Sequence, residues 1–121
     1  MTIDGVKLTL QVANDPAERE TGLMHVAEMP ADHGMIFVFP RPGRLGFWMK
    51  DTLIPLDIVY LDAAGRVLNV ERMEPGDETL VPSAGRAQWA IELNAGRAAE
   101  LKIAPGDRLI VPAMAWPEYA R

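Results

Sequence analysis

Alternating apolar and polar residues near the start of the chain predict its first strand. In Lys7–Ala13 (KLTLQVA), leucine and valine occupy every second position, as in a strand with one buried face. Asn14–Pro16 follows, where a capping side chain precedes a proline suited to a first helical turn, and good helix formers continue the segment. We therefore predict a short helix that ends near Gly22.

An unbroken apolar run marks the predicted centre of the core. Gly34–Phe39 (GMIFVF) has no polar position, as expected of a strand covered on both faces. Pro40–Gly43 is a turn signal, and Leu45–Lys50 then returns as a strand rich in large side chains. These two strands can pair as a hairpin.

The second half of the chain contains the clearest hairpin. Pro55 interrupts an apolar run, and Leu56–Leu61 and Arg66–Met73 follow as strands joined by a turn with Gly65. Prolines and glycines make Glu74–Arg86 a predicted long loop. The remaining predicted elements are a strand at Ala87–Leu93, a short helix at Ala95–Lys102 and a last strand at Arg108–Val111.

This order of elements predicts a mainly β fold. About seven strands and one or two short helices, without βαβ alternation, favour a single-domain β-barrel or a two-sheet sandwich. We assign residues 1–113 to the domain and residues 114–121 to a loose C-terminal tail.

Composition narrows the classes of function. The net charge of -5 and the lack of a Lys and Arg run argue against a nucleic-acid partner. No apolar stretch is long enough to suggest a membrane span. The chain has no cysteine, which excludes a disulfide framework, a thiolate zinc site and a thiol nucleophile. It also has no phosphate-binding or dinucleotide fingerprint, so no cofactor is predicted.

Three segments in order carry a family resemblance. They are Arg19–Met24 (RETGLM), Gly34–Phe39 and Phe47–Ile58 (FWMKDTLIPLDI), and together they resemble the DUF192 family of bacterial and archaeal proteins. The resemblance extends over roughly Lys7 to Val111. Further similar positions are Glu74-Pro75, Pro82-Ser83, Ile91–Leu93, Gly96 and Gly106-Asp107.

The resemblance implies a jelly-roll-like β fold and no particular activity. Family members often carry an N-terminal export signal or a lipid attachment, so we expect a periplasmic or otherwise exported protein whose signal could precede this chain. Two departures from the family pattern are visible. Asp51 stands where asparagine is usual, and His25 and Val26 stand where an arginine is common.

Asp57 and Glu92 are the candidate catalytic residues. General acid and base chemistry needs two carboxyl groups with separated pKa values in one cleft. Asp57 lies within an apolar run, however, where a buried structural hydrogen bond to a turn amide is the commoner role.

Charged and aromatic residues suggest a binding pocket. Trp48 can stack on a flat ligand, although a tryptophan beside a methionine is more often part of the core. Lys50 can form an anion-binding corner with Arg41 and Arg44, or can simply be solvated. The predicted binding residues are Arg19, Trp48, Lys50, Asp57 and Glu92.

No metal site is predicted. His25 and His33 lack a third ligand nearby, and Ser83 does not lie in a nucleophile elbow. Several methionines suit Cu(I) chemically, but methionine also fills irregular cores. They are Met24, Met29, Met35, Met49 and Met73.

The leading hypothesis from the sequence is a non-catalytic small-molecule-binding or accessory domain of the cell envelope. Its partner would be a small molecule or another envelope protein. The first alternative is a carbohydrate-active hydrolase or lyase that uses Asp57 and Glu92. The second alternative is copper binding through methionine.

Overall fold

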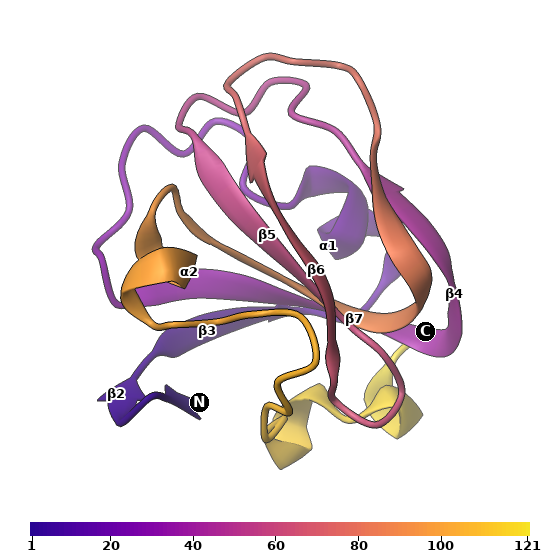
Figure 1. Cartoon of the computed structure of the whole chain (residues 1–121). Helices are drawn as coiled ribbons and strands as arrows, with labels where there is room; N and C mark the ends of the chain where they lie inside the picture. Colours follow the sequence, from indigo (N-terminus) through magenta and orange to yellow (C-terminus); the bar gives the residue numbers. More distant parts are fainter.

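Seven strands make up most of the regular structure. The computed structural model describes residues 1–121 (Figure 1). The strands are β1 (Thr2–Ile3), β2 (Val6–Lys7), β3 (Thr9–Ala13), β4 (His33–Phe47), β5 (Leu56–Leu61), β6 (Val67–Met73) and β7 (Val81–Asn94). The helices are α1 (Pro16–Thr21) and α2 (Arg97–Glu100), and two 3-10 turns, η1 (Ala113–Ala115) and η2 (Pro117–Tyr119), end the chain.

The strands form one five-stranded sheet and one small sheet. The large sheet has the order β3-β4-β7-β5-β6, and β1 pairs with β2. Only β3 and β4 are parallel, and the other neighbours are antiparallel. The predicted mainly β, sandwich-like fold with two short helices is confirmed. The sheet does not close into a barrel, because β3 and β6 remain as its edges.

The predicted hairpin between Gly34–Phe39 and Leu45–Lys50 is wrong, because Gly34–Phe39 and Leu45–Phe47 lie in the single strand β4. Its first half pairs with the end of β7, as at Ile36 and Ile91. Its second half pairs with the start of β7, as at Phe47 and Val81. The two strands curve together (Figure 1). The register shifts between Val38 and Gly43, so the prolines there fall where the regular ladder is interrupted.

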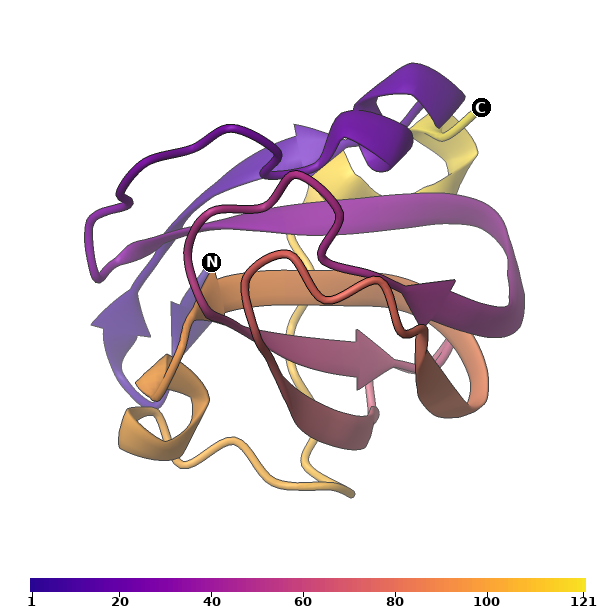
Figure 2. The ribbon, with the colours of Figure 1, turned by 90° about the horizontal axis from the view of Figure 1, so that it is seen from above.

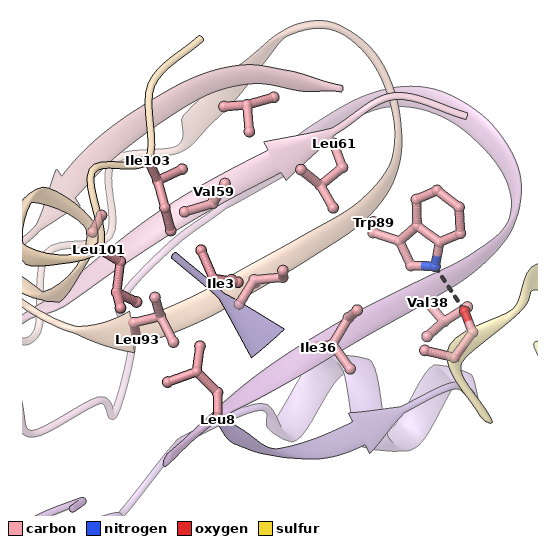
Figure 3. Close-up of a cluster of buried hydrophobic side chains, with 14 residues drawn as sticks. Ile3, Leu8, Ile36, Val38, Val59, Leu61, Trp89, Leu93, Leu101 and Ile103 are labelled. Atoms are coloured by element: carbon pink, nitrogen blue, oxygen red, sulfur yellow. Dashed lines mark hydrogen bonds between the residues drawn. The ribbon is translucent and has the colours of Figure 1, made fainter. Parts of the chain in front are cut away.

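Both faces of the large sheet are buried, as the unbroken apolar run predicts. Ile36 and Val38 belong to a first hydrophobic cluster, which also receives residues from β1, α2 and the C-terminal region (Figure 3). Met35 and Phe37 belong to a second cluster on the opposite face, together with Leu23. The central strands therefore separate two cores.

Other element predictions have mixed outcomes. The hairpin of β5 and β6 is confirmed, with Leu56 opposite Met73. The helix α1 is also confirmed, and its N-cap Asp15 accepts a hydrogen bond from the Glu18 amide at 2.8 Å. The predicted long loop is too long, because β7 already begins at Val81. The helix α2 is shorter than predicted, and the expected last strand is reduced to one bridge between Arg66 and Arg108.

The C-terminal residues pack against the sheet and α1. Trp89 of β7 donates from Nε1 to the buried carbonyl of Ala115 at 2.7 Å (Figure 3). The amide of Arg121 donates to the Asn14 carbonyl at 2.9 Å, so the end of the chain lies beside α1 (Figure 2). Residues 114–121, predicted as a loose tail, thus make defined contacts. Neither helix has the length and apolar character needed to cross a membrane.

Candidate ligand-binding site

A cavity of about 250 Å³ lies between α1 and the sheet face that carries the second hydrophobic cluster. Its walls come from α1 and the residues after it, from both halves of β4, from the segment that follows β4, and from β7. The lining residues include Arg19, Glu20, Gly22, Leu23, Met24, Phe37, Phe39, Phe47, Trp48, Thr52 and Glu92.

Three phenylalanines of β4 form the aromatic part of the wall. Phe37 and Phe39 come from the first half of the bent strand, and Phe47 comes from its end. The ring centroids of Phe37 and Phe47 are 4.8 Å apart, and those of Phe39 and Phe47 are 6.3 Å apart, both in edge-to-face geometry. Such pairs stabilise aromatic clusters, so the rings connect the two halves of β4 across the bend.

Glu92 is the acidic group of the cavity. It is the one acidic residue of β7, and it lies opposite Met35 of β4 and Ile58 of β5, whose side chains belong to the second cluster. Only 4% of the residue is exposed. Its carboxyl group forms no hydrogen bond or ion pair within the chain. Every fully buried side-chain oxygen of the protein does have a hydrogen-bond partner, so the oxygens of Glu92 are not fully buried. The carboxyl oxygens therefore reach the cavity.

Burial raises the pKa of Glu92 from its ordinary 4.5 to about 8. The cause is loss of hydration, since an ionised carboxylate is disfavoured in apolar surroundings without a partner. Tyr60 of β5 is also buried on this face, and burial raises its pKa. Its hydroxyl donates to the Val81 carbonyl at 2.6 Å. In the unliganded protein at neutral pH, Glu92 is therefore mostly protonated.

Arg19 joins α1 to two other parts of the fold. Its guanidinium donates to the carbonyl oxygen of Val38 at 2.9 Å and to that of Arg121 at 2.5 Å. The guanidinium carbon also lies 5.1 Å from the ring centroid of Phe39. Arg19 therefore lies in the cavity wall, and its guanidinium donates to backbone carbonyls.

Trp48 and Lys50 lie at the outer end of the site. Trp48 is 43% exposed and lines the cavity, so it is not a core residue. Met49 takes the buried position in its place, because side chains alternate along this extended segment. Lys50 is exposed and is not part of the cavity wall, and its Nζ lies 5.5 Å from the Trp48 ring centroid.

Asp57 lies on the other face of the sheet. Its Oδ1 accepts from Nε of Arg72 at 2.9 Å, and its Oδ2 accepts from the amides of Gly96 and Ala98 at 2.9 and 3.1 Å. These partners connect β5 to α2. Asp57 and Glu92 are therefore not brought into one cleft, and the structure does not assemble the acid and base pair considered from the sequence.

No metal centre is evident. No three His, Cys, Asp or Glu side chains lie close enough together to hold an ion. Met35, Met49 and Met73 are buried members of the second hydrophobic cluster, and Met29 packs against that cluster. Their side chains contribute to the core, which is the other role considered for methionine.

The two departures from the family pattern meet beside the cavity. The amide of His25 donates to the carbonyl of Asp51 at 2.9 Å. Both residues have left-handed backbone angles, with φ of 65° and 54°. Asparagine and aspartate tolerate this conformation better than most residues, so aspartate can replace asparagine here without a change of backbone.

The structure brings together Arg19, Trp48 and Glu92 of the five predicted binding residues. Sequence reasoning missed the phenylalanines, because Phe37 and Phe39 were assigned to the core and Phe47 to a separate predicted strand. The available signal was Glu92 itself. A lone acid between Ile91 and Leu93 in a strand buried on both faces requires either a partner or a cavity.

Comparisons with known proteins agree with the resemblance seen in the sequence. Among curated proteins, none matches this chain. A solved structure from Novosphingobium aromaticivorans DSM 12444, a protein of unknown function, is 40% identical, with a TM-score of 0.81 over 84% of this chain and 73% of that one. A second structure, from Sinorhizobium meliloti 1021, is described as a candidate transcription regulator. It is 38% identical, with a TM-score of 0.81 over 84% of this chain and 79% of that one.

A match to a family model identifies the family of the chain. The DUF192 model, described only as an uncharacterized ACR, matches residues 1–111 of the 121 residues. This match includes every residue of the cavity wall named above. The chain therefore belongs to the DUF192 family.

Proposed function

We propose that the chain is a small-molecule-binding domain whose ligand occupies the cavity between α1 and the sheet. One observation carries this proposal. The three segments that mark the family, Arg19–Met24, Gly34–Phe39 and Phe47–Ile58, are distant in sequence, and each contributes residues to this cavity, which also receives Glu92. If these three segments had only a structural role, they would not all need to line the same cavity.

The chemistry of the wall supports binding. Small-molecule sites are concave, mostly apolar, and carry a few polar groups that orient the ligand. Here Phe37, Phe39 and Phe47 provide the apolar part, and the carboxyl group of Glu92 is the buried polar group without a partner. Because Asp57 lies on the opposite face, we propose binding without turnover.

The test is a titration of isotopically labelled protein with small neutral aromatic probes, beginning with indole, followed by amide chemical shifts. We expect saturable shifts at cavity residues such as Leu23, Gly46 and Thr52. Replacing Trp48 by alanine removes one aromatic contact, so Trp48→Ala should weaken probe binding by about three- to tenfold.

Trp116 provides a matched control, because it is 46% exposed, close to the 43% of Trp48, and does not line this cavity. Trp116→Ala should leave probe binding unchanged. Shifts that are absent from the cavity residues, or that depend equally on both tryptophans, would contradict the proposal.

We further propose that this binding takes place in the cell envelope. The support is the family resemblance, since many members carry export signals, and the lack of cysteine is compatible with an oxidising compartment. Fractionation of the native host with an antibody against the chain tests the location. Recovery in the cytoplasmic fraction alone would contradict it.

Transcription regulation, the role suggested for the Sinorhizobium relative, has little support in this chain. Its net charge is -5, whereas contact with the DNA backbone depends on clustered Lys and Arg. A ligand-binding role is the one that we propose.

A further inference from the structure

The unpartnered carboxyl group of Glu92 indicates what the ligand must supply. The residue is 4% exposed, its carboxyl oxygens open into the cavity, and no group of the chain forms a hydrogen bond or an ion pair with them. Buried acids are normally paired, because an unpaired group loses its hydration without compensation. A ligand that brings a cationic donor would provide the missing partner.

The rest of the wall also favours positive charge. The faces of aromatic rings attract cations, and Phe37, Phe39, Phe47 and Trp48 all contribute to the wall. Glu20 adds a second carboxyl group to the lining. The basic residue of the wall, Arg19, forms no ion pair with Glu92, because its guanidinium donates to two backbone carbonyls and lies against Phe39.

We propose that the cavity binds a small organic cation, with its ammonium group at the carboxylate of Glu92 and its apolar body against the phenylalanines of β4. This inference rests on the proposed binding function and adds the chemical class of the ligand. An organic anion would be repelled by Glu20, and by Glu92 once that carboxyl group is ionised, and a neutral apolar molecule would leave Glu92 unpaired.

Binding of such a cation is coupled to proton release. In the free protein Glu92 holds its proton up to about pH 8, whereas the ion pair requires the ionised carboxylate. The other titratable groups near Glu92 are Arg19 and Glu20 on α1 and Tyr60 on β5. Affinity for the cation should therefore rise about tenfold per pH unit below pH 8 and level off above it.

Three probes of similar shape test the ligand class: 2-phenylethylamine as the cation, propylbenzene as the neutral analogue and 3-phenylpropanoate as the anion. We expect the amine to bind at least tenfold more tightly than either analogue at about pH 8, where half of Glu92 is ionised in the free protein. Calorimetry at about pH 6.5 in buffers of different ionisation enthalpy should show release of about one proton for each amine bound.

Variants at two glutamates complete the test. Glu92→Gln keeps the size of the side chain and should abolish both the preference for the amine and the proton release. Glu78→Gln removes an exposed glutamate outside the cavity and should change neither.

The two proposals fail in different ways. If all three probes bind with equal affinity, or if the amine preference survives in Glu92→Gln, the ligand class is wrong and the binding function stands. If no probe shifts the cavity residues, both proposals are overturned. Propylbenzene binding that depends on Trp48, without a preference for the amine, supports the binding function alone.

Discussion

At the scale of single residues, Glu92 and Asp57 show how two acids in neighbouring buried strands acquire different roles. Asp57 has three partners that share its negative charge, including the amides of Gly96 and Ala98. Glu92 has none, and burial raises its pKa to about 8. The alternation of side chains along a strand directs them to opposite faces of the sheet. The first is thus suited to stabilise the fold, and the carboxyl group of the second opens into the candidate site.

Stability should depend on pH through Glu92. Between pH 4.5 and about 8 the unfolded chain has released the proton that the folded chain retains, so the free energy of unfolding falls as pH rises. The expected slope from this residue is about 1.4 kcal/mol per pH unit. Urea denaturation of the protein and of Glu92→Gln across this range measures it.

The variant should lose this slope and should be the more stable protein at pH 8, because glutamine cannot ionise. The pKa of Asp77 is also shifted, but it is lowered by a hydrogen bond from the Thr79 amide, so its effect belongs to lower pH and is common to both proteins. Parallel stability curves for the two proteins would contradict the burial of an unpaired Glu92.

The left-handed backbone of Asp51 gives a second prediction at this scale. With φ of 54°, a residue with a Cβ atom is strained unless its side chain suits the conformation, as that of asparagine or aspartate does. Asp51→Ala should lower the free energy of unfolding by about 1 kcal/mol. Asp51→Asn should leave it nearly unchanged, and Asp51→Gly should not lower it.

Denaturation curves of the three Asp51 variants provide the measurement. Equal losses in all three would mean that the aspartate carboxylate, rather than the backbone conformation, matters at this position.

At the scale of elements, the sequence predicted strands better than their connections. Alternation and apolar runs depend on local side chains, so β3, the first half of β4, β5 and β6 were found near their observed positions. The bend of β4 was interpreted as a turn, because Pro40 and Pro42 are strong turn residues in isolation. The partner strand β7 bends with β4, and no local pattern indicates that long-range pairing.

The residues of the candidate site could be predicted only in part, for the same reason. Arg19, Trp48 and Glu92, which the structure places in the cavity wall, were candidates because charged and aromatic side chains stand out in the sequence. Phe39 and Phe47 meet only because β4 bends, and their ring centroids are 6.3 Å apart. A contact created by a bend cannot be predicted when the bend itself is not.

The connection between β5 and α2 depends on Asp57, which gives a prediction at the scale of elements. Asp57→Asn keeps the size of the side chain but removes the negative charge that three donors share. Buried hydrogen bonds to a charged group are worth roughly 1.5–3 kcal/mol. We expect a loss of unfolding free energy in that range, measured by urea denaturation.

Arg72 provides the comparison for Asp57, since its side chain is 52% exposed while that of Asp57 is 7% exposed. Arg72→Gln should cost less than 1 kcal/mol, because exposed ion pairs are weak. Probe binding in the cavity should be unchanged in both variants. Loss of probe binding in Asp57→Asn would mean that Asp57 acts on the site through the sheet.

At the scale of the whole molecule, the C-terminal residues connect the two faces of the sheet. Ala115 is buried in the first cluster, where its carbonyl accepts from Trp89. Six residues later, the carbonyl of Arg121 accepts from Arg19, which lines the cavity on the other face. The end of the chain therefore contacts both the core and the wall of the candidate site.

Trp89→Phe should show how much the hydrogen bond from Trp89 to Ala115 contributes to the free energy of unfolding, because it removes the donor and retains a large aromatic ring. The buried carbonyl of Ala115 would then lack its partner, at a cost of about 1–3 kcal/mol.

Trp116→Phe is the matched control, since Trp116 is exposed and its Nε1 lies 3.4 Å from the Val111 carbonyl. We expect Trp89→Phe, but not Trp116→Phe, to lower the unfolding free energy and to speed proteolysis after residue 111. If the two variants behave alike, the packing of the C-terminal residues does not depend on the Trp89 hydrogen bond, and their contacts with α1 must hold them in place.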